Sequence, residues 1–109
     1  MATNYKVLGQ SNPSATTATT LYTVPAATQA VISTIVVANL ASTAATFRIA
    51  VRVAGATLAN SQYVAYDVTV GASDSTALTL GLTLGATDVV TVYASSANLT
   101  FSAFGSEIA

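Results

Sequence analysis

The 109-residue chain contains no cysteine, no histidine and no tryptophan. These absences exclude disulfide frameworks, zinc sites built on cysteine or histidine, haem ligation and any catalytic triad that needs an imidazole. Serine and threonine are plentiful, but a hydroxyl nucleophile needs a neighbouring base. The single lysine, Lys6, lies near the start of the chain and is interpreted as a solvated side chain. We therefore expect a protein that is not an enzyme and that needs no cofactor and no metal.

Charge is equally scarce, at 6% of the residues, whereas 52% are hydrophobic. The ionisable acidic and basic side chains are Lys6, Arg48, Arg52, Asp67, Asp74, Asp88 and Glu107. Three basic residues do not supply the electrostatic footprint of a nucleic-acid-binding protein. A soluble surface usually carries about 25–35% charged residues, so little repulsion keeps copies of this chain apart. We infer that much of its surface is covered by further copies or by partner proteins.

Neither membrane insertion nor secretion is indicated. The first residues lack the basic segment followed by an apolar segment that marks a secretion signal, so we expect synthesis in the cytoplasm. The uncharged stretch from Val7 to Phe47 is interrupted by Pro13 and Pro25. Its hydrophobic period is nearer to two than to 3.6, which argues against a membrane helix.

The residues that are abundant favour β-structure. Alanine (22), threonine (18), valine (13) and serine (11) dominate, and threonine and valine suit a pleated, half-buried surface. Within residues 76–84, leucine recurs at every second position from Leu78, which puts the leucines on one face of a strand, most simply the core face. In residues 47–53, the inward positions are Phe47, Ile49, Val51 and Val53, and the outward ones are Arg48, Ala50 and Arg52. In residues 62–70, one face carries Val64, Tyr66, Val68 and Val70, and the other carries Tyr63, Ala65, Asp67 and Thr69.

Together these patterns predict one all-β domain over residues 1–109, an antiparallel β-sandwich of jelly-roll or immunoglobulin-like type. The expected strands, about eight, cover residues 5–8, 19–24, 30–38, 47–53, 62–70, 76–84, 88–94 and 98–104. Clusters of glycine, proline, asparagine, aspartate and serine separate them. Residues 1–20 have a second interpretation as an N-terminal arm that reaches onto a neighbour, because residues 11–20 are polar and uncharged.

The candidate interface residues are Arg48, Arg52, Asp67 and Tyr63. The two arginines share a strand face, about 13 Å apart. They either pair with carboxylates such as Asp67 on a facing surface, or are solvated charges. A third alternative is an intramolecular pair, if the Asp67 strand lies beside the arginine strand. Tyr63 and Tyr66 are expected on opposite faces, so they predict no shared aromatic patch.

Two carboxylates follow glycine-containing turns, Asp74 after Gly71 and Asp88 after Gly85. One interpretation brings both to one end of the sandwich, where they bind Ca²⁺ with loop carbonyls. The favoured interpretation is that each caps its own turn by accepting backbone N–H bonds.

Several segments carry a family resemblance. They are residues 21–26 (LYTVPA), 31–39 (VISTIVVAN), 46–52 (TFRIAVR), 62–67 (QYVAYD), 78–84 (LTLGLTL), 87–93 (TDVVTVY) and 104–108 (FGSEI). Over nearly the whole chain this pattern resembles short virion structural proteins of tailed bacteriophages. The resemblance implies a non-enzymatic β-sandwich on the capsid or the tail of the virion.

Two functions follow from the resemblance and the composition. The first is a capsid decoration protein, which stabilises the particle through contacts with itself and with other virion proteins such as the major capsid protein; analogy suggests a homotrimer. The second is a tail- or fibre-associated module that binds a host surface or a glycan through loops 54–60 and 71–75, expected at one end of the sandwich.

Overall fold

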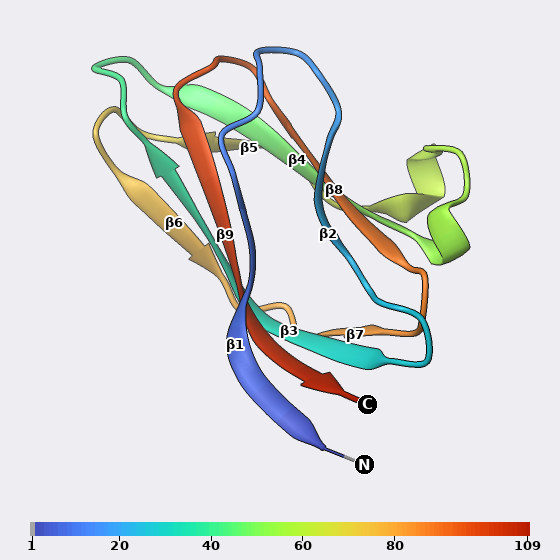
Figure 1. Ribbon diagram of the computed structural model, residues 1–109. Coiled ribbons are helices and arrows are strands. Elements are labelled where there is room, and N and C mark those ends of the chain that lie inside the picture. The colour runs from blue at the N-terminus through green and yellow to red at the C-terminus, as the bar shows by residue number, and fades with distance from the viewer. Residues whose placement is uncertain (1) are drawn as a thin grey trace.

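The structure is a computed structural model that describes residues 2–109, folded into two antiparallel sheets (Figure 1). The strands are β1 (Thr3–Ser11), β2 (Thr19–Thr23), β3 (Gln29–Asn39), β4 (Ala45–Arg52), β5 (Tyr63–Val70), β6 (Ser75–Leu78), β7 (Leu82–Leu84), β8 (Val89–Ala94) and β9 (Leu99–Ile108). Two short 3₁₀ turns, η1 (Val53–Gly55) and η2 (Asn60–Gln62), lie between β4 and β5. The predicted all-β sandwich is confirmed.

The order of the strands identifies the type of sandwich. The first sheet has the order β1-β9-β3-β6, with β7 also pairing with β3, and the second has the order β2-β8-β4-β5. The chain therefore passes repeatedly from one sheet to the other, and the last strand lies between the first and the third. This is the double Greek-key order of a jelly roll, and it differs from the order of an immunoglobulin fold.

The core lies between the two sheets and is built from alternate residues of their strands. Phe47 of β4 and Phe101 of β9 meet edge to face, with ring centroids 6.0 Å apart, and so connect the second sheet to the first. The largest fully buried side chains are Phe47, Phe101, Ile32, Ile35, Ile49, Leu99, Val24, Val37, Val70, Val90 and Val92. Period-two alternation predicts this inward set because successive side chains of a strand point to opposite faces.

The leucine-rich segment differs from its prediction as one strand. It forms β6 and β7, and the backbone turns at Gly81, whose φ is +63°. Leu84 is buried, and Leu78 and Leu82 pack against the core, but Leu80 lies in the break and is exposed. Glycine adopts a positive φ without steric cost, so it permits the break.

The first twenty residues contribute an edge strand to the sandwich. β1 pairs with β9 from Thr3 to Ser11, with a register shift at Leu8. Residue 1 lies outside the described residues. In the part of the arm segment that the structure describes, residues 3–11 belong to the first sheet of the same chain.

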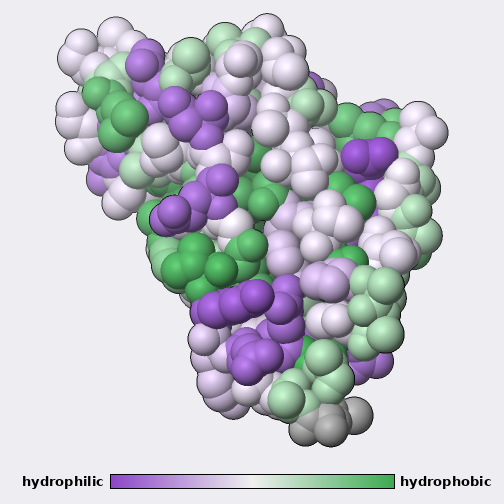
Figure 2. All heavy atoms as spheres, viewed as in Figure 1, coloured by the Kyte–Doolittle hydropathy of each residue, from purple (hydrophilic) through white to green (hydrophobic). Residues whose placement is uncertain are grey.

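The surface is poor in strongly polar areas. The face in Figure 2 is largely pale, the colour of residues of intermediate hydropathy, with hydrophilic and hydrophobic areas that adjoin each other on part of it. This matches a composition rich in threonine, serine and alanine.

Candidate functional site

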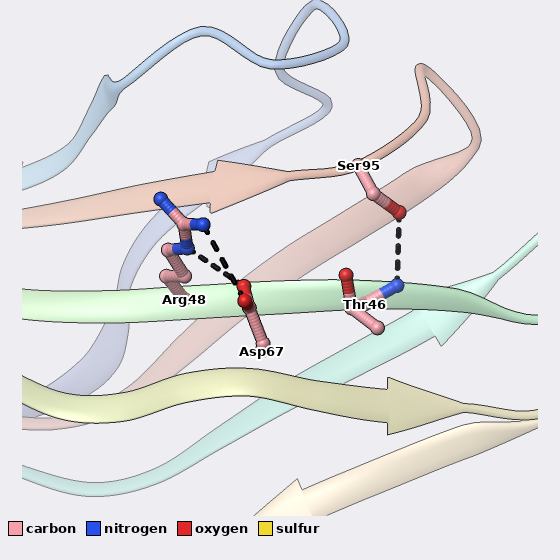
Figure 3. A network of polar contacts seen from close by, with 4 residues as sticks. All are labelled: Thr46, Arg48, Asp67 and Ser95. Carbon is pink, nitrogen blue, oxygen red and sulfur yellow. Dashed lines mark hydrogen bonds and ion pairs between the residues drawn. The ribbon is translucent and has the colours of Figure 1, made fainter.

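Two of the candidate interface residues form an ion pair on the outer face of the second sheet. Arg48 of β4 and Asp67 of β5 point toward each other, with Nε 2.7 Å from Oδ1 and Nη2 3.4 Å from Oδ2 (Figure 3). The hydrogen bond with Asp67 raises the pKa of Arg48 above its ordinary value. Of the alternatives for Arg48, the intramolecular pair is therefore the one that forms. Beside it, the N–H of Thr46 donates to Oγ of Ser95 and ties β4 to the end of β8.

A β-bulge in β5 determines how these side chains are presented. Phe47 pairs with Val68 and Ile49 pairs with Ala65, so both Tyr66 and Asp67 face Arg48. Asp67 has a φ of +51°, in the left-handed region that aspartate tolerates better than most residues. An extra residue in one strand shifts the alternation of side chains beyond it.

The predicted faces of residues 62–70 are therefore partly wrong. Ala65, expected outside, packs against the core, whereas Tyr66, expected inside, is 56% exposed. Val64 is also exposed. Val68 and Val70, which follow the bulge, have the inward positions that the alternation predicts.

The bulge also places Tyr66 in contact with both Arg48 and Tyr63, and Tyr93 of β8 contacts Arg48 as well. The guanidinium carbon lies 4.2 Å from the ring centroid of Tyr66 and 4.4 Å from that of Tyr93. The rings of Tyr63 and Tyr66 are in edge-to-face contact, 4.9 Å between centroids. The prediction that Tyr63 and Tyr66 lie on opposite faces is wrong, because a second register shift follows between Ile49 and Ala50. We name Arg48, Tyr63, Tyr66, Asp67 and Tyr93 the Tyr–Arg cluster.

The sequence contains signals for the two members that were not among the candidates. Tyr93 is opposite Arg48 in the pairing of β4 with β8, and it alternates with the buried Val92 and Ala94, which marks it as outward. Tyr66 precedes an aspartate in the middle of an otherwise apolar strand. Aspartate is depleted from strands and tolerates positive φ, so its presence there is a signal for a bulge.

Arg52 has a different role from Arg48. Its Nε donates to the carbonyl of Ala56 at 2.7 Å, and its Nη2 donates to the carbonyl of Gly55 at 3.0 Å. Arg52, the last residue of β4, thus holds the connection between β4 and β5 against the end of β4. Val53, expected to face inward, is exposed, because β4 ends at Arg52 and the chain turns into η1.

Beside the cluster, on the outer face of the second sheet, Thr91 has a hydroxyl that is buried. Thr91 lies opposite Ala50, which is buried although its position in the alternation is outward. Thr91 is 5% exposed, and its Oγ1 has no hydrogen-bond partner among residues 2–109.

A second polar group joins the two sheets near the ends of the chain. Glu107 of β9 accepts a hydrogen bond from the hydroxyl of Tyr22 on β2, and its Oε1 lies 2.8 Å from Nζ of Lys6 on β1. The bonds from Lys6 and Tyr22 lower the pKa of Glu107 below its ordinary value. Burial, with help from Glu107, raises the pKa of Tyr22. Lys6 is thus engaged with a carboxylate and is not the freely solvated lysine that was expected.

The two turn aspartates lie at opposite ends of the sandwich. The carbonyl of Asp74 accepts from the N–H of Asn39, at the end of β3. The carbonyl of Asp88 accepts from the N–H of Val24, close to the start of β3. Asp88 accepts from the N–H groups of Gly85 and Ala54, both at 2.9 Å. The shared Ca²⁺ site is therefore wrong, and no group of three or more metal-ligating side chains occurs in the described residues. The favoured interpretation is confirmed: Asp88 accepts the N–H of Gly85 in its own turn, and Oδ1 of Asp74 accepts the N–H of Ser75 at 2.8 Å.

The loops expected to form a binding tip also lie far apart. Residues 54–60 precede β5, and residues 71–75 follow it, so one strand separates them. In Figure 1 the first loop is the light green segment on the right, and the second is at the left, between β5 and β6. The prediction that both lie at one end is wrong.

Two open hollows lie elsewhere on the surface, with volumes of about 380 and 350 Å³. The first is lined by Gln10, Ser11, Asn12, Thr100, Phe101 and Ser102, and the second by Ala27, Thr28, Gln29, Gly85, Ala86, Ile108 and Ala109. The side chains that line them are uncharged.

No protein-family model matches the chain, and no curated protein matches it. Over residues 2–109, no helix has the length and hydropathy that crossing a bilayer requires.

Proposed function

We propose that the protein is a structural component of a bacteriophage virion, most simply a capsid decoration protein that stabilises the particle through contacts between subunits. The observation that carries the proposal is the Tyr–Arg cluster, a rigid aromatic and cationic surface on the outside of a jelly roll. The resemblance to short phage virion proteins supports the same function. The jelly roll is an architecture of viral capsid domains, although it also occurs in lectins.

The chemistry of the cluster suits a protein partner. Tyrosine and arginine are enriched among the residues that dominate binding energy at interfaces. Arg48 is held by Asp67 and by two rings, and Tyr66 by Arg48 and Tyr63. Side chains that are already fixed lose little conformational entropy on binding, so the cluster is preorganised.

The opposite face of the molecule supports extensive contact as well. Lys6 and Glu107 belong to the first sheet, but both lie with Tyr22 on its inner side. On the outer side, the strand residues that the structure describes are uncharged, and Tyr5, Val7 and Phe104 are exposed there. Such a face approaches another protein surface without desolvating a charge.

The proposed mechanism is geometric. Each copy buries on the order of 1,000 Å² or more against its neighbours or the major capsid protein. Binding to the assembled particle but not to its dissociated subunits stabilises the assembled state by mass action. No bond is made or broken.

The test is binding of purified protein to phage particles that lack it, measured by co-sedimentation. We expect Tyr66→Ser to weaken binding about thirtyfold, the effect of losing about 2 kcal/mol at a dominant interface residue. Leu40→Ser is the matched control, because Leu40 is exposed on the β3–β4 connection, outside the cluster. Equal binding by both variants, or no binding by the unmodified protein, would contradict the proposal.

A second function is favoured by one observation, the gathering of three tyrosine rings on one face. Exposed aromatic rings, a cation and a carboxylate are also features of sugar-binding surfaces, which would make the protein a host-surface or glycan-binding module of the tail. A glycan array with the unmodified protein and Tyr66→Ser distinguishes the two. Specific signals that the variant loses favour the glycan module, and a blank array favours the structural protein.

A further inference from the structure

The four sheet edges differ in how they are protected from further pairing. Edge strands are commonly kept short, bulged or charged. β2 has only five residues and a register shift, and the β6–β7 edge is broken at Gly81. β5 has two register shifts and the charged Asp67. β1 is the exception, since it has nine residues, and its single shift at Leu8 leaves residues 3–7 regular.

The side chains of β1 do not protect this edge either. Tyr5 is 85% exposed and Val7 is 49% exposed. The only charge of the segment is on Lys6, which is directed to Glu107 on the inner side of the sheet. Beyond Leu8 the edge is closed, because Gly9 passes so near the carbonyl of Leu21 that a β-carbon would overlap it. The open part is therefore residues 3–7.

The pairing of the termini shows which backbone groups of this segment are free. Ala2 and Ala109 exchange both hydrogen bonds, at 2.8 and 3.0 Å. In an antiparallel ladder such pairs alternate with pairs that make no hydrogen bond. Counting along the register, Asn4 and Lys6 bond to β9, whereas Thr3, Tyr5 and Val7 direct their N–H and C=O groups away from it.

We propose that this edge pairs with β1 of a second copy of the chain, antiparallel and about a two-fold axis at Tyr5. Thr3 then lies opposite Val7 of the second copy, and Tyr5 lies opposite itself. Their free groups form about six hydrogen bonds in this register.

The charges disfavour one neighbouring register. With Tyr5 on the axis, Lys6 faces Asn4 of the second copy, and no like charges meet. Shifting the axis to Lys6 would place two lysines directly opposite each other, which destabilises a strand pair. The pairing joins two first sheets into one continuous sheet with an uncharged outer face.

The inference rests on the self-contact that the proposed function requires, and it names the surface that makes it. An isologous contact closes after two copies, so it gives a dimer in place of the trimer that analogy suggests. It is testable with purified protein alone. Failure of self-pairing would leave binding to the particle through the Tyr–Arg cluster as a separate result.

The first experiment is sedimentation equilibrium over a range of concentrations, with variants at one position. The unmodified protein and Tyr5→Thr, which keeps the backbone N–H, should form dimers. Tyr5→Pro should remain monomeric, because proline removes an N–H that faces away from β9 and leaves the fold intact. Tyr5→Lys should also be monomeric, since it places like charges across the axis, and it covers the case in which the proline variant does not fold.

Hydrogen exchange gives a residue-level readout of the same contact. The amides of Tyr5 and Val7 should exchange at least tenfold more slowly in concentrated protein than in dilute protein. Those of Asn4 and Lys6, bonded to β9, should be equally protected in both. A monomer at every concentration, a trimer, a dimer that survives both Tyr5→Pro and Tyr5→Lys, or no change at Tyr5 and Val7 would overturn the proposal.

Discussion

Asp67 has a structural effect larger than its charge suggests. Asp67, with its positive φ, is part of the β-bulge in β5. The bulge turns the tyrosine before it out of the core and onto Arg48. The outward position of Arg48 could be predicted from alternation. The tyrosine cluster was not predicted, because the aspartate in the middle of the strand signals a bulge but does not show how β5 pairs with β4 on either side of it.

Glu107 gives a prediction on pH at the residue scale. Because its pKa is lowered in the folded protein, the carboxylate contributes stability above the ordinary glutamate pKa, and this is lost as the pH falls through the lowered value. Glu107→Gln should therefore reduce the free energy of unfolding by about 1 kcal/mol at pH 7. Urea unfolding at pH 7 and at pH 3 measures the difference, which should shrink at the lower pH.

The control for Glu107 is Asp74→Asn, which removes a carboxylate from a turn at the other end of the sandwich. It should not reproduce the pH-dependent gap. A Glu107→Gln variant that is as stable as the unmodified protein at pH 7, or equally destabilised at both pH values, would contradict the role assigned to this bond.

At the scale of the strand, the existence of most elements could be predicted from the sequence, but their breaks and neighbours could not. Residues 30–38, 88–94 and 98–104 were each predicted as a strand and correspond to β3, β8 and β9, because alternating or buried β-branched runs are unambiguous. The break between β6 and β7 was missed, since Gly81 fits a continuous strand pattern as well as it fits a turn. The neighbour of each strand was not predictable, because antiparallel sandwiches of different topology share the same local patterns.

Gly105 supplies a prediction at the scale of the strand. A β-carbon there would overlap the carbonyl oxygen of Val31, so β9 and β3 would have to separate near the centre of the first sheet. Gly105→Ala should reduce the stability by about 3 kcal/mol, the upper part of the usual range for overpacking. Gly71→Ala is the matched control, since its β-carbon would meet Asp74 only at 3.7 Å, an ordinary contact. Thermal unfolding compares the two, and equal melting temperatures would contradict the close approach.

At the scale of the whole molecule, the jelly roll separates two kinds of surface. The second sheet presents the Tyr–Arg cluster, and the first sheet presents an uncharged face and the open β1 edge. With few charges available, the chain uses Lys6, Glu107, Arg48 and Asp67 in internal pairs. Composition alone predicted a surface poor in charge; the folded chain was needed to show which surfaces we propose for contact.

Imaging of the intact phage particle by electron cryomicroscopy tests the central claim most directly, because the claim is that this chain functions through contact area on a virion. We predict density for the jelly roll on the particle surface, with the Tyr–Arg cluster against a neighbouring protein and β1 facing β1 of a second copy. Particles whose density and protein content lack the chain would contradict the account.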